Sequence, residues 1–163
     1  LSCVDYVIQA QANPENYNLI FPAYHFDAFY WTSATPVTAA WNDDFIENID
    51  IQLYEFTPPP SGSSGVSGGV YYSNAKGEPV KNIDVILEYD DPTEKSLVPV
   101  GLKKTDALGE WSFGNLAEGT FRVLVDIPGL NIDSVYTVTI SEPNSNVADL
   151  NYYVDPERGI FNQ

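Results

Sequence analysis

The chain has 163 residues, of which 44% are hydrophobic and 13% aromatic, so it can bury a sizeable core and is not a disordered chain. With 23 acidic residues against 7 basic ones, its formal net charge is −16, and such a field repels nucleic acids and anionic membranes. Neither is therefore an expected partner, and no apolar run approaches the ~18–20 residues that membrane insertion requires.

Two segments in the first third of the chain show the alternation of apolar and polar side chains that is typical of β-strands. They predict one strand over residues 3–11 and another over residues 49–53. The alternating apolar residues are Val4, Tyr6 and Ile8 in the first segment and Ile49, Ile51 and Leu53 in the second. Between them, residues 17–41 keep no sustained period, which predicts a packed irregular segment with one helical turn near residues 36–42.

A change of composition at residues 57–65 predicts a linker, since three prolines stiffen its first half and glycine and serine loosen its second half. Residues 66–155 are then expected to form one complete domain, and residues 156–163 a tail that leaves it. Strands are predicted near residues 66–73, 82–89, 97–104, 110–114, 120–126, 134–141 and 147–154. Seven short strands with alternating patterns are typical of an antiparallel β-sandwich.

Residues 105–121 carry the most specific pattern in the chain. Asp106 and Gly109 predict a turn, because the aspartate side chain can bond to the backbone and the glycine can take a positive φ. The segment reads T-D-x-x-G-x-W-x-F-x-N-L-x-x-G-x-F. Together with the G-x-P turn at residues 77–80, it resembles the transthyretin-like sandwich of the carboxypeptidase regulatory-like and Cna protein B-type repeat domains. The resemblance spans about residues 66–154 and implies a fold and a placement in secreted bacterial surface proteins, but no reaction.

An internal comparison bears on residues 1–56. Residues 5–10 parallel residues 120–125, and residues 48–54 parallel residues 146–152. We therefore interpret residues 1–56 as a partial β-sandwich unit, the last strands of a preceding domain of the same kind with an aromatic-rich irregular insertion. The expected fold class is all-β, with this partial unit followed by an antiparallel seven-stranded, immunoglobulin-like or transthyretin-like sandwich.

A partial sandwich leaves hydrophobic faces and strand edges uncovered. Either the natural protein continues upstream, or another copy supplies the missing strands by strand addition. In the second case Val4, Tyr6 and Ile8 would form the acceptor, and Ile160 and Phe161 the donated or docking element. Such a head-to-tail contact does not close and builds a filament, so the expected partner is another copy or a neighbouring repeat.

Four aromatic residues of the irregular segment admit two interpretations. They are Tyr24, Tyr30, Trp31 and Trp41. In one interpretation they form an exposed platform on which sugar rings stack, as in carbohydrate-binding modules. In the other they are packing residues that close the open end of the partial unit, each ring burying roughly 150–250 Å². The packing interpretation is favoured, because buried aromatic side chains are the commoner case.

The partial unit also carries a resemblance of its own. The matching residues are Tyr6, Ile8, Ala10, Pro14, Pro22, Tyr24, Trp31, Ala34 and Thr35, followed by Ile49-Asp50-Ile51-Gln52-Leu53 and the linker. The pattern resembles a repeat found toward the C-terminal ends of large secreted proteins of Bacteroidetes-like bacteria, which are commonly exported by the type IX route. The resemblance implies an extracellular or cell-surface location and roles in adhesion, surface filaments or polymer-degrading assemblies.

Catalytic and metal-binding groups are few. His25 is the only histidine and Cys3 the only cysteine. The chain therefore lacks the histidine and cysteine ligands of a usual zinc site and the second cysteine of an intrachain disulfide. No residue pattern of a catalytic triad is present either, so no enzyme is expected. We interpret His25 as a packing or hydrogen-bonding residue. Carboxylates in turns that could meet at one end of the sandwich suit calcium; they are Asp90, Asp91, Glu94 and Asp106. Because the calcium-loop motif is absent, solvated turns are favoured, and no cofactor is expected.

These patterns together predict a non-catalytic structural module of a secreted bacterial cell-surface protein. It would form a stalk or filament by domain repetition or strand complementation and would be used in adhesion. The alternative is a carbohydrate-binding accessory module of a secreted polysaccharide-degrading enzyme, in which case the partner is a glycan.

Overall fold

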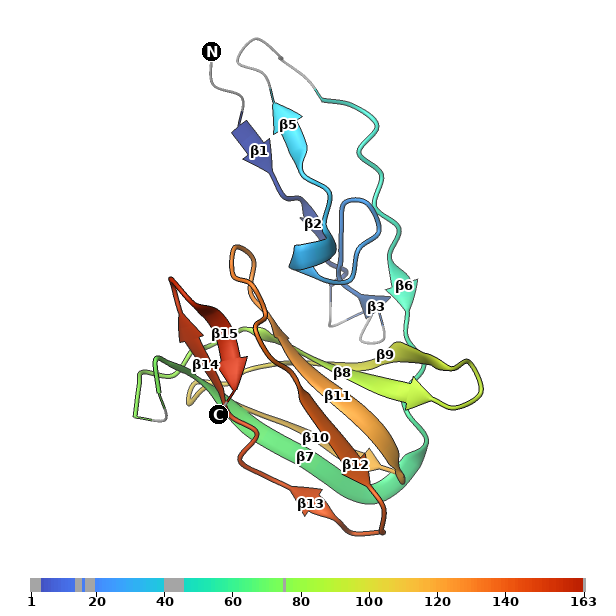
Figure 1. The fold of residues 1–163 in the computed structure, drawn as a ribbon. Coiled ribbons are helices and arrows are strands. Elements are labelled where there is room, and N and C mark those ends of the chain that lie inside the picture. The colour runs from blue at the N-terminus through green and yellow to red at the C-terminus, as the bar shows by residue number, and fades with distance from the viewer. Residues whose placement is uncertain (1–3, 14–15, 17–19, 40–45, 75, 163) are drawn as a thin grey trace. The chain divides into compact units, whose positions relative to one another are not determined.

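The structure is a computed structural model that describes residues 4–13, 16, 20–39, 46–74 and 76–162. The chain divides into two compact units, Leu1–Phe56 and Thr57–Gln163, called the first and second unit below. Strands and turns make up both units, and within the described residues the helical content is one short 3-10 helix, η1 (Trp31–Ser33) (Figure 1). This confirms the all-β fold class. No helix in this part of the chain has the length and apolar character that a membrane crossing would need.

The first unit is built from short antiparallel ribbons. Its two-stranded sheets pair β1 (Val4–Tyr6) with β5 (Val37–Ala39), β2 (Gln9–Ala10) with β4 (Ala23–Tyr24), and β3 (Ile20–Phe21) with β6 (Tyr54–Glu55). The strand expected over residues 3–11 is thus two strands. The helical turn expected near residues 36–42 is wrong over its described part, where β5 lies, and residues 40–42 are outside the described residues.

The strand expected over residues 49–53 is also wrong, because this segment has no strand partner and β6 begins only at Tyr54. The backbone N–H of Gln52 donates instead to the side chain of Asp27, at 2.7 Å. Ile49, Ile51 and Leu53 are nevertheless half-buried. Their alternation therefore reports which side chains pack, and not a hydrogen-bonded ladder.

The second unit is a β-sandwich whose two sheets lie face to face (Figure 1). One sheet has the order β10-β7-β14-β15, with β13 also paired to β7, and the other has the order β12-β11-β8-β9. The strands are β7 (Ser61–Tyr72), β8 (Asp84–Asp91), β9 (Ser96–Lys104), β10 (Glu110–Leu116), β11 (Gly119–Asp126), β12 (Tyr136–Ile140), β13 (Asn146–Val147), β14 (Tyr152–Asp155) and β15 (Gly159–Asn162). The described residues of this unit thus form nine strands rather than the seven expected.

Alternating side chains of facing strands form the core between the sheets. Trp111 and Phe113 of β10 and Phe121, Val123 and Val125 of β11 are all buried in one hydrophobic cluster. Their polar neighbours Ser112 and Glu110 are exposed, as the period-two pattern requires. The predicted turn before β10 is confirmed, because Asp106 accepts the backbone N–H groups of Leu108 and Glu110 and Gly109 has a φ of 75°. The core of the unit therefore follows from the alternation.

The last predicted strand, over residues 147–154, is interrupted. Asp149 has a φ of 61°, a left-handed conformation that breaks strand geometry between β13 and β14. The interrupted segment still runs along β7, since the N–H of Leu150 donates to the carbonyl of Ser67 at 3.1 Å. Both β13 and β14 pair with β7 in parallel, on the edge opposite to antiparallel β10.

The tail expected to leave the domain at residues 156–163 is wrong. Its described part turns back and forms β15, which pairs antiparallel with β14. The side chain of Asp155 accepts the N–H groups of Glu157 and Arg158, which closes the turn, and Gly159 supplies a φ of 95°. Pro156 and Gly159 are therefore turn residues of a hairpin rather than the start of an exit.

The linker expected over residues 57–65 ends earlier, because β7 begins at Ser61. Ser61 pairs with Leu116 of β10, so the Gly/Ser half of the expected linker is part of the sheet. A β-carbon added at Gly62 would lie 2.3 Å from the carbonyl oxygen of Leu116. Only glycine fits this position without moving the backbone.

Gly62→Ala is accordingly expected to lower the free energy of unfolding of the second unit by about 1–3 kcal/mol, since a backbone atom cannot swing aside as a side chain can. The matched control is Gly114→Ala in β10, where an added β-carbon meets no heavy atom within 4 Å and the change should be close to neutral. Urea unfolding followed by tryptophan fluorescence measures both. Equal effects of the two changes would mean that residues 61–65 behave as a linker.

Candidate functional site

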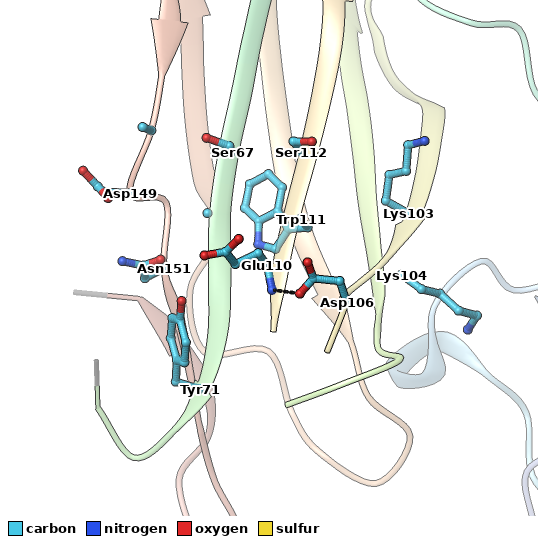
Figure 2. Close-up of a pocket in the computed structure, with 12 residues that line it drawn as sticks. Ser67, Tyr71, Lys103, Lys104, Asp106, Glu110, Trp111, Ser112, Asp149 and Asn151 are labelled. Atoms are coloured by element: carbon cyan, nitrogen blue, oxygen red, sulfur yellow. Dashed lines mark hydrogen bonds between the residues drawn. The ribbon is translucent and has the colours of Figure 1, made fainter. Parts of the chain in front are cut away.

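A hollow of about 530 Å³ opens on the second unit. Its walls come from β7, the start of β10, the end of β9 with the turn that follows, and the interrupted segment at residues 148–151 (Figure 2). The volume lies within the range of small-molecule sites, roughly 300–1,000 Å³. Its lining is mostly polar, so the hollow suits a polar ligand better than an apolar one.

The Asp106 turn places the first carboxylate of the hollow. Because Asp106 accepts the N–H of Glu110 at 2.9 Å, the position of Glu110 at the start of β10 is held by this turn (Figure 2). Glu110 pairs with Gly69 of β7, and Tyr71 covers that glycine: a β-carbon there would lie 2.4 Å from the Tyr71 hydroxyl oxygen. The tyrosine ring and the Glu110 carboxylate therefore border the same wall.

Tyr71 is electrostatically coupled to this wall. Burial of its hydroxyl raises the pKa of Tyr71 above its usual value, and the charges of Glu110, Tyr153, Asp106 and Asp149 raise it further. The phenol therefore stays protonated at neutral pH. It can donate one hydrogen bond to a ligand and accept others.

Asn151 and Asp149 form the opposite wall. The N–H of Gly69 donates to the Asn151 side-chain oxygen at 2.9 Å, so the orientation of the amide is set by β7. The amide nitrogen of Asn151 then points its donors away from this bond, and no described residue accepts from it. Asp149 is exposed beside it, held by the left-handed backbone that interrupts the strand.

Trp111 forms the floor of this region. It pairs with Gly68, and a β-carbon at Gly68 would lie 2.9 Å from the indole ring, so the glycine allows the ring to lie across β7. Only 4% of the Trp111 surface is exposed, and its ring nitrogen has no hydrogen-bond partner among the described residues. A buried N–H without a partner costs about 1–3 kcal/mol, and this nitrogen is covered by the core between the sheets.

The charges around the hollow have both signs. Lys104 is bound to Asp84 at 2.6 Å, whereas Lys103 is exposed and has no ion pair with a described residue. Asp106 is committed to its turn. Glu110, Asp149 and Lys103 therefore remain as charged groups whose side chains are open to a ligand.

The predicted aromatic patch is only partly open. Tyr24 is 2% exposed, so its ring is not available for stacking, which agrees with the favoured packing interpretation and removes this residue from the alternative exposed platform. Tyr30 and Trp31 are half-buried, and Trp41 lies outside the described residues. His25 hydrogen-bonds through its Nδ1 to the carbonyl of Thr35 at 3.1 Å, which confirms its interpretation as a hydrogen-bonding residue.

The residues expected in assembly fall into two groups. Val4 and Tyr6 lie on β1 with 49% and 53% of their surfaces exposed, and Ile8 is half-buried. Ile160 and Phe161 are buried within β15, at 0% and 5% exposure. The second pair is thus already docked in its own sheet, and only β1 presents open apolar side chains.

The turns considered for calcium do not meet. Asp91 pairs with Ser96 at the loop end of the β8–β9 hairpin, whereas Asp84 pairs with Lys104 at the other end, beyond which Asp106 lies. The two ends of an eight-residue strand are about 23 Å apart, so Asp91 and Asp106 cannot share one ion. Among the described residues no group of three or more histidine, cysteine or carboxylate side chains is arranged to hold a metal ion.

Sequence reasoning missed the hollow, since its residues come from strands whose pairing was unknown. The signal that marks it is Gly68-Gly69 inside a strand pattern, because glycine in a strand often indicates close approach by another group. Here the two glycines accommodate the rings of Trp111 and Tyr71.

Comparison with known proteins adds little about activity. No model of a known protein family matches the chain, and no curated protein matches it. Among solved structures, the "Crystal structure of (S)-allantoin synthase" contains a chain that is similar with a TM-score of 0.45 and 12% sequence identity. The likeness covers 64% of this chain and 44% of that one, so this chain spans less than half the length of its neighbour. At such values the likeness does not bear on activity.

Proposed function

We propose that the chain is a non-catalytic structural module of a secreted bacterial cell-surface protein, exported by the type IX route and used in adhesion. In this proposal copies or repeats join into a stalk or filament through the first unit. The second unit is the stable spacer, and the high negative charge keeps neighbouring copies soluble and apart except at the joining contact.

The exposed apolar side chains of β1 support this proposal most directly. Val4 and Tyr6 stand on a three-residue strand whose described ladder is with β5 alone. Two-stranded ribbons are marginally stable in water and usually need a further strand or a packed face. A strand added at β1 would cover both side chains and supply that ladder.

Two of the four edge strands of the second unit, β15 and β9, are protected by comparison. The outer edge of β15 is covered by residues 131–133, since the N–H of Ile160 donates to Asn131 and the N–H of Asp133 donates to Ile160. The edge strand β9 carries Pro99 and two lysines, which discourage pairing. These two edges are therefore less suited to joining than β1.

Tyr6→Asp is expected to raise the protein concentration at which assemblies form by roughly tenfold or more, because burying an aromatic side chain contributes about 1.5–3 kcal/mol and a charge there opposes contact. Light scattering over a concentration series, with electron microscopy of the same samples, measures the change. Leu108→Asp is the matched control, since Leu108 is a 63% exposed apolar residue in a turn of the second unit. A wild-type chain that stays monomeric at every concentration would sink the proposal.

The alternative is a carbohydrate-binding accessory module of a secreted polysaccharide-degrading enzyme. The aromatic residues of the first unit were expected to support it, but the support comes from the second unit. The buried ring of Tyr24 weakens the aromatic platform of the first unit. The polar hollow of the second unit favours the alternative instead.

A further inference from the structure

We propose that β12 receives β1 of another copy, along the edge where β12 has no strand partner among the described residues. The inference rests on the joining role proposed above for β1 and names the surface that β1 joins. A filament needs two different surfaces on every copy, because a surface that pairs with itself closes into a dimer. β1 supplies one of them, and the edge strands of the second unit are where an added strand can be received.

β12 has the fewest features that discourage pairing among the four strands at the ends of the two sheets. β15 is covered along its outer edge, and β9 carries a proline and two lysines. β10 has a register shift between Phe113 and Leu116, where Asn115 has a φ of 60°. The carbonyl of Glu110, at the start of β10, also accepts the N–H of Asp106 at 3.0 Å. A register shift bends a strand, so β10 is a poor template for a straight partner.

The edge of β12 is regular and uncharged. β12 pairs with β11 over five consecutive residues without a register shift. Its sequence, Tyr-Thr-Val-Thr-Ile, contains no proline, glycine or charged residue and is rich in the β-branched residues that favour strands. Residues 134–141 are all uncharged, although the chain has a net charge of −16. β1 of a second copy therefore meets no carboxylate on this strand.

The apolar face of β12 would be extended by β1. Val138 and Ile140 belong to the core between the sheets, at 7% and 1% exposure, and Tyr136 packs against the same core. Because side chains at every second position of a strand share one face, Val4 and Tyr6 lie on one face of β1. An added strand places residues of the same face side by side. The two exposed apolar side chains of β1 would then continue the apolar layer of the sandwich instead of staying in water.

The polar faces match as well. Thr137 and Thr139 are the exposed side chains of β12, and Asp5 is the polar residue of β1. A threonine hydroxyl can donate to a carboxylate across a strand pair. This pairing already exists in the first unit, where Thr38 stands opposite Asp5 and its hydroxyl donates to Asp5 at 2.6 Å. A carboxylate has two acceptor oxygens, so Asp5 can accept from a threonine on each side of β1.

Thr139→Lys tests the edge, because a lysine on an edge strand discourages pairing. The variant is expected to raise the protein concentration at which assemblies form by roughly tenfold or more, measured by light scattering with electron microscopy of the same samples. Since the substitution lowers the net negative charge, a loss of assembly cannot come from stronger repulsion between copies. Thr137→Lys repeats the test at the other exposed position of β12, and urea unfolding checks that both variants keep the fold.

Ser112→Lys is the matched control. Ser112 is an exposed polar residue on the edge strand β10, and its substitution makes the same change of charge. This variant is expected to assemble at the same concentration as the wild type.

Mixing two variants identifies the pairing. Tyr6→Asp blocks β1 and keeps β12, whereas Thr139→Lys blocks β12 and keeps β1. At concentrations where the wild type assembles, the mixture should form dimers of about twice the 18.0 kDa of one chain, and each variant alone should stay monomeric. Analytical ultracentrifugation measures these masses.

The outcomes separate this proposal from the one on which it rests. A wild type that stays monomeric overturns both. Assembly that Tyr6→Asp blocks but Thr139→Lys leaves unchanged overturns the pairing with β12 and leaves β1 as the joining element. Dimers of Thr139→Lys alone would mean that β1 pairs with β1 of another copy, and a loss of assembly in Ser112→Lys alone would move the contact to β10. Either result also overturns the assignment to β12.

Discussion

Tyr152→Phe is expected to lower the free energy of unfolding of the second unit by about 2–4 kcal/mol, although it removes a single oxygen atom. The Tyr152 ring is fully buried, and its hydroxyl donates to the carbonyl of Val123 on β11 and accepts the N–H of Tyr136 on β12. In return the Tyr136 hydroxyl donates to the carbonyl of Asn151 at 3.0 Å. The hydroxyl of Tyr152 therefore ties one sheet of the sandwich to the other, and its loss leaves a buried carbonyl and a half-buried N–H without this partner.

The measurement is urea unfolding, with Tyr153→Phe as the matched control. Tyr153 is the next residue in β14 and is also buried, but its hydroxyl has no hydrogen bond with any residue that the structure describes. The control should change the stability by less than about 0.5 kcal/mol. Equal losses for the two variants would show that the hydrogen bonds of the Tyr152 hydroxyl do not account for the effect.

The same residue predicts a dependence on pH. Burial raises the pKa of Tyr152 well above its ordinary value of 10.0, so the folded chain keeps the proton where the unfolded chain releases it. The contribution to stability is fully present below pH 10 and is lost as the pH rises beyond the unfolded value. The wild type should therefore lose stability more steeply above that pH than Tyr152→Phe, which a series of unfolding curves at alkaline pH measures.

The core of the second unit could be predicted from sequence because period-two alternation is a local signal. Trp111, Phe113 and Phe121 alternate with polar residues over short distances, and the Asp106 turn is closed by groups only two and four residues away. Each of these features needs no knowledge of distant contacts. The sandwich class follows from them, since half-buried strands must cover one another.

Pairing between distant strands could not be predicted in the same way. The parallel pairing of β13 and β14 with β7 joins residues about eighty positions apart, and no local pattern specifies it. The hollow depends on this pairing, because Asn151 reaches Gly69 only when the interrupted segment runs beside β7. The sequence therefore contains the residues of the hollow, but it does not show that they lie side by side.

The composition of the C-terminal segment is compatible with two structures, a tail that leaves the domain and the hairpin of β14 and β15 that is observed. Pro156 and Gly159 interrupt a strand in either case. The residues that follow decide whether the chain leaves the domain or pairs with β14. Ile160 and Phe161 are apolar, and leaving both side chains in water would be unfavourable in free energy. Ile160 enters the core between the sheets, while Phe161 packs against Tyr153 and carries Arg158 over its ring at 3.8 Å.

Ile160→Ala should accordingly lower the free energy of unfolding of the second unit by about 2–5 kcal/mol, the cost of removing a fully buried aliphatic side chain and leaving a cavity. This would be a large share of the roughly 5–15 kcal/mol that a domain has. Urea unfolding measures it, and Leu108→Ala, at a 63% exposed position, should be close to neutral. If β15 were instead an element donated to another copy, the substitution would spare the stability of the isolated chain and reduce only assembly. An unchanged unfolding curve would therefore reject the docked hairpin, whereas the predicted loss would leave β1 as the joining element.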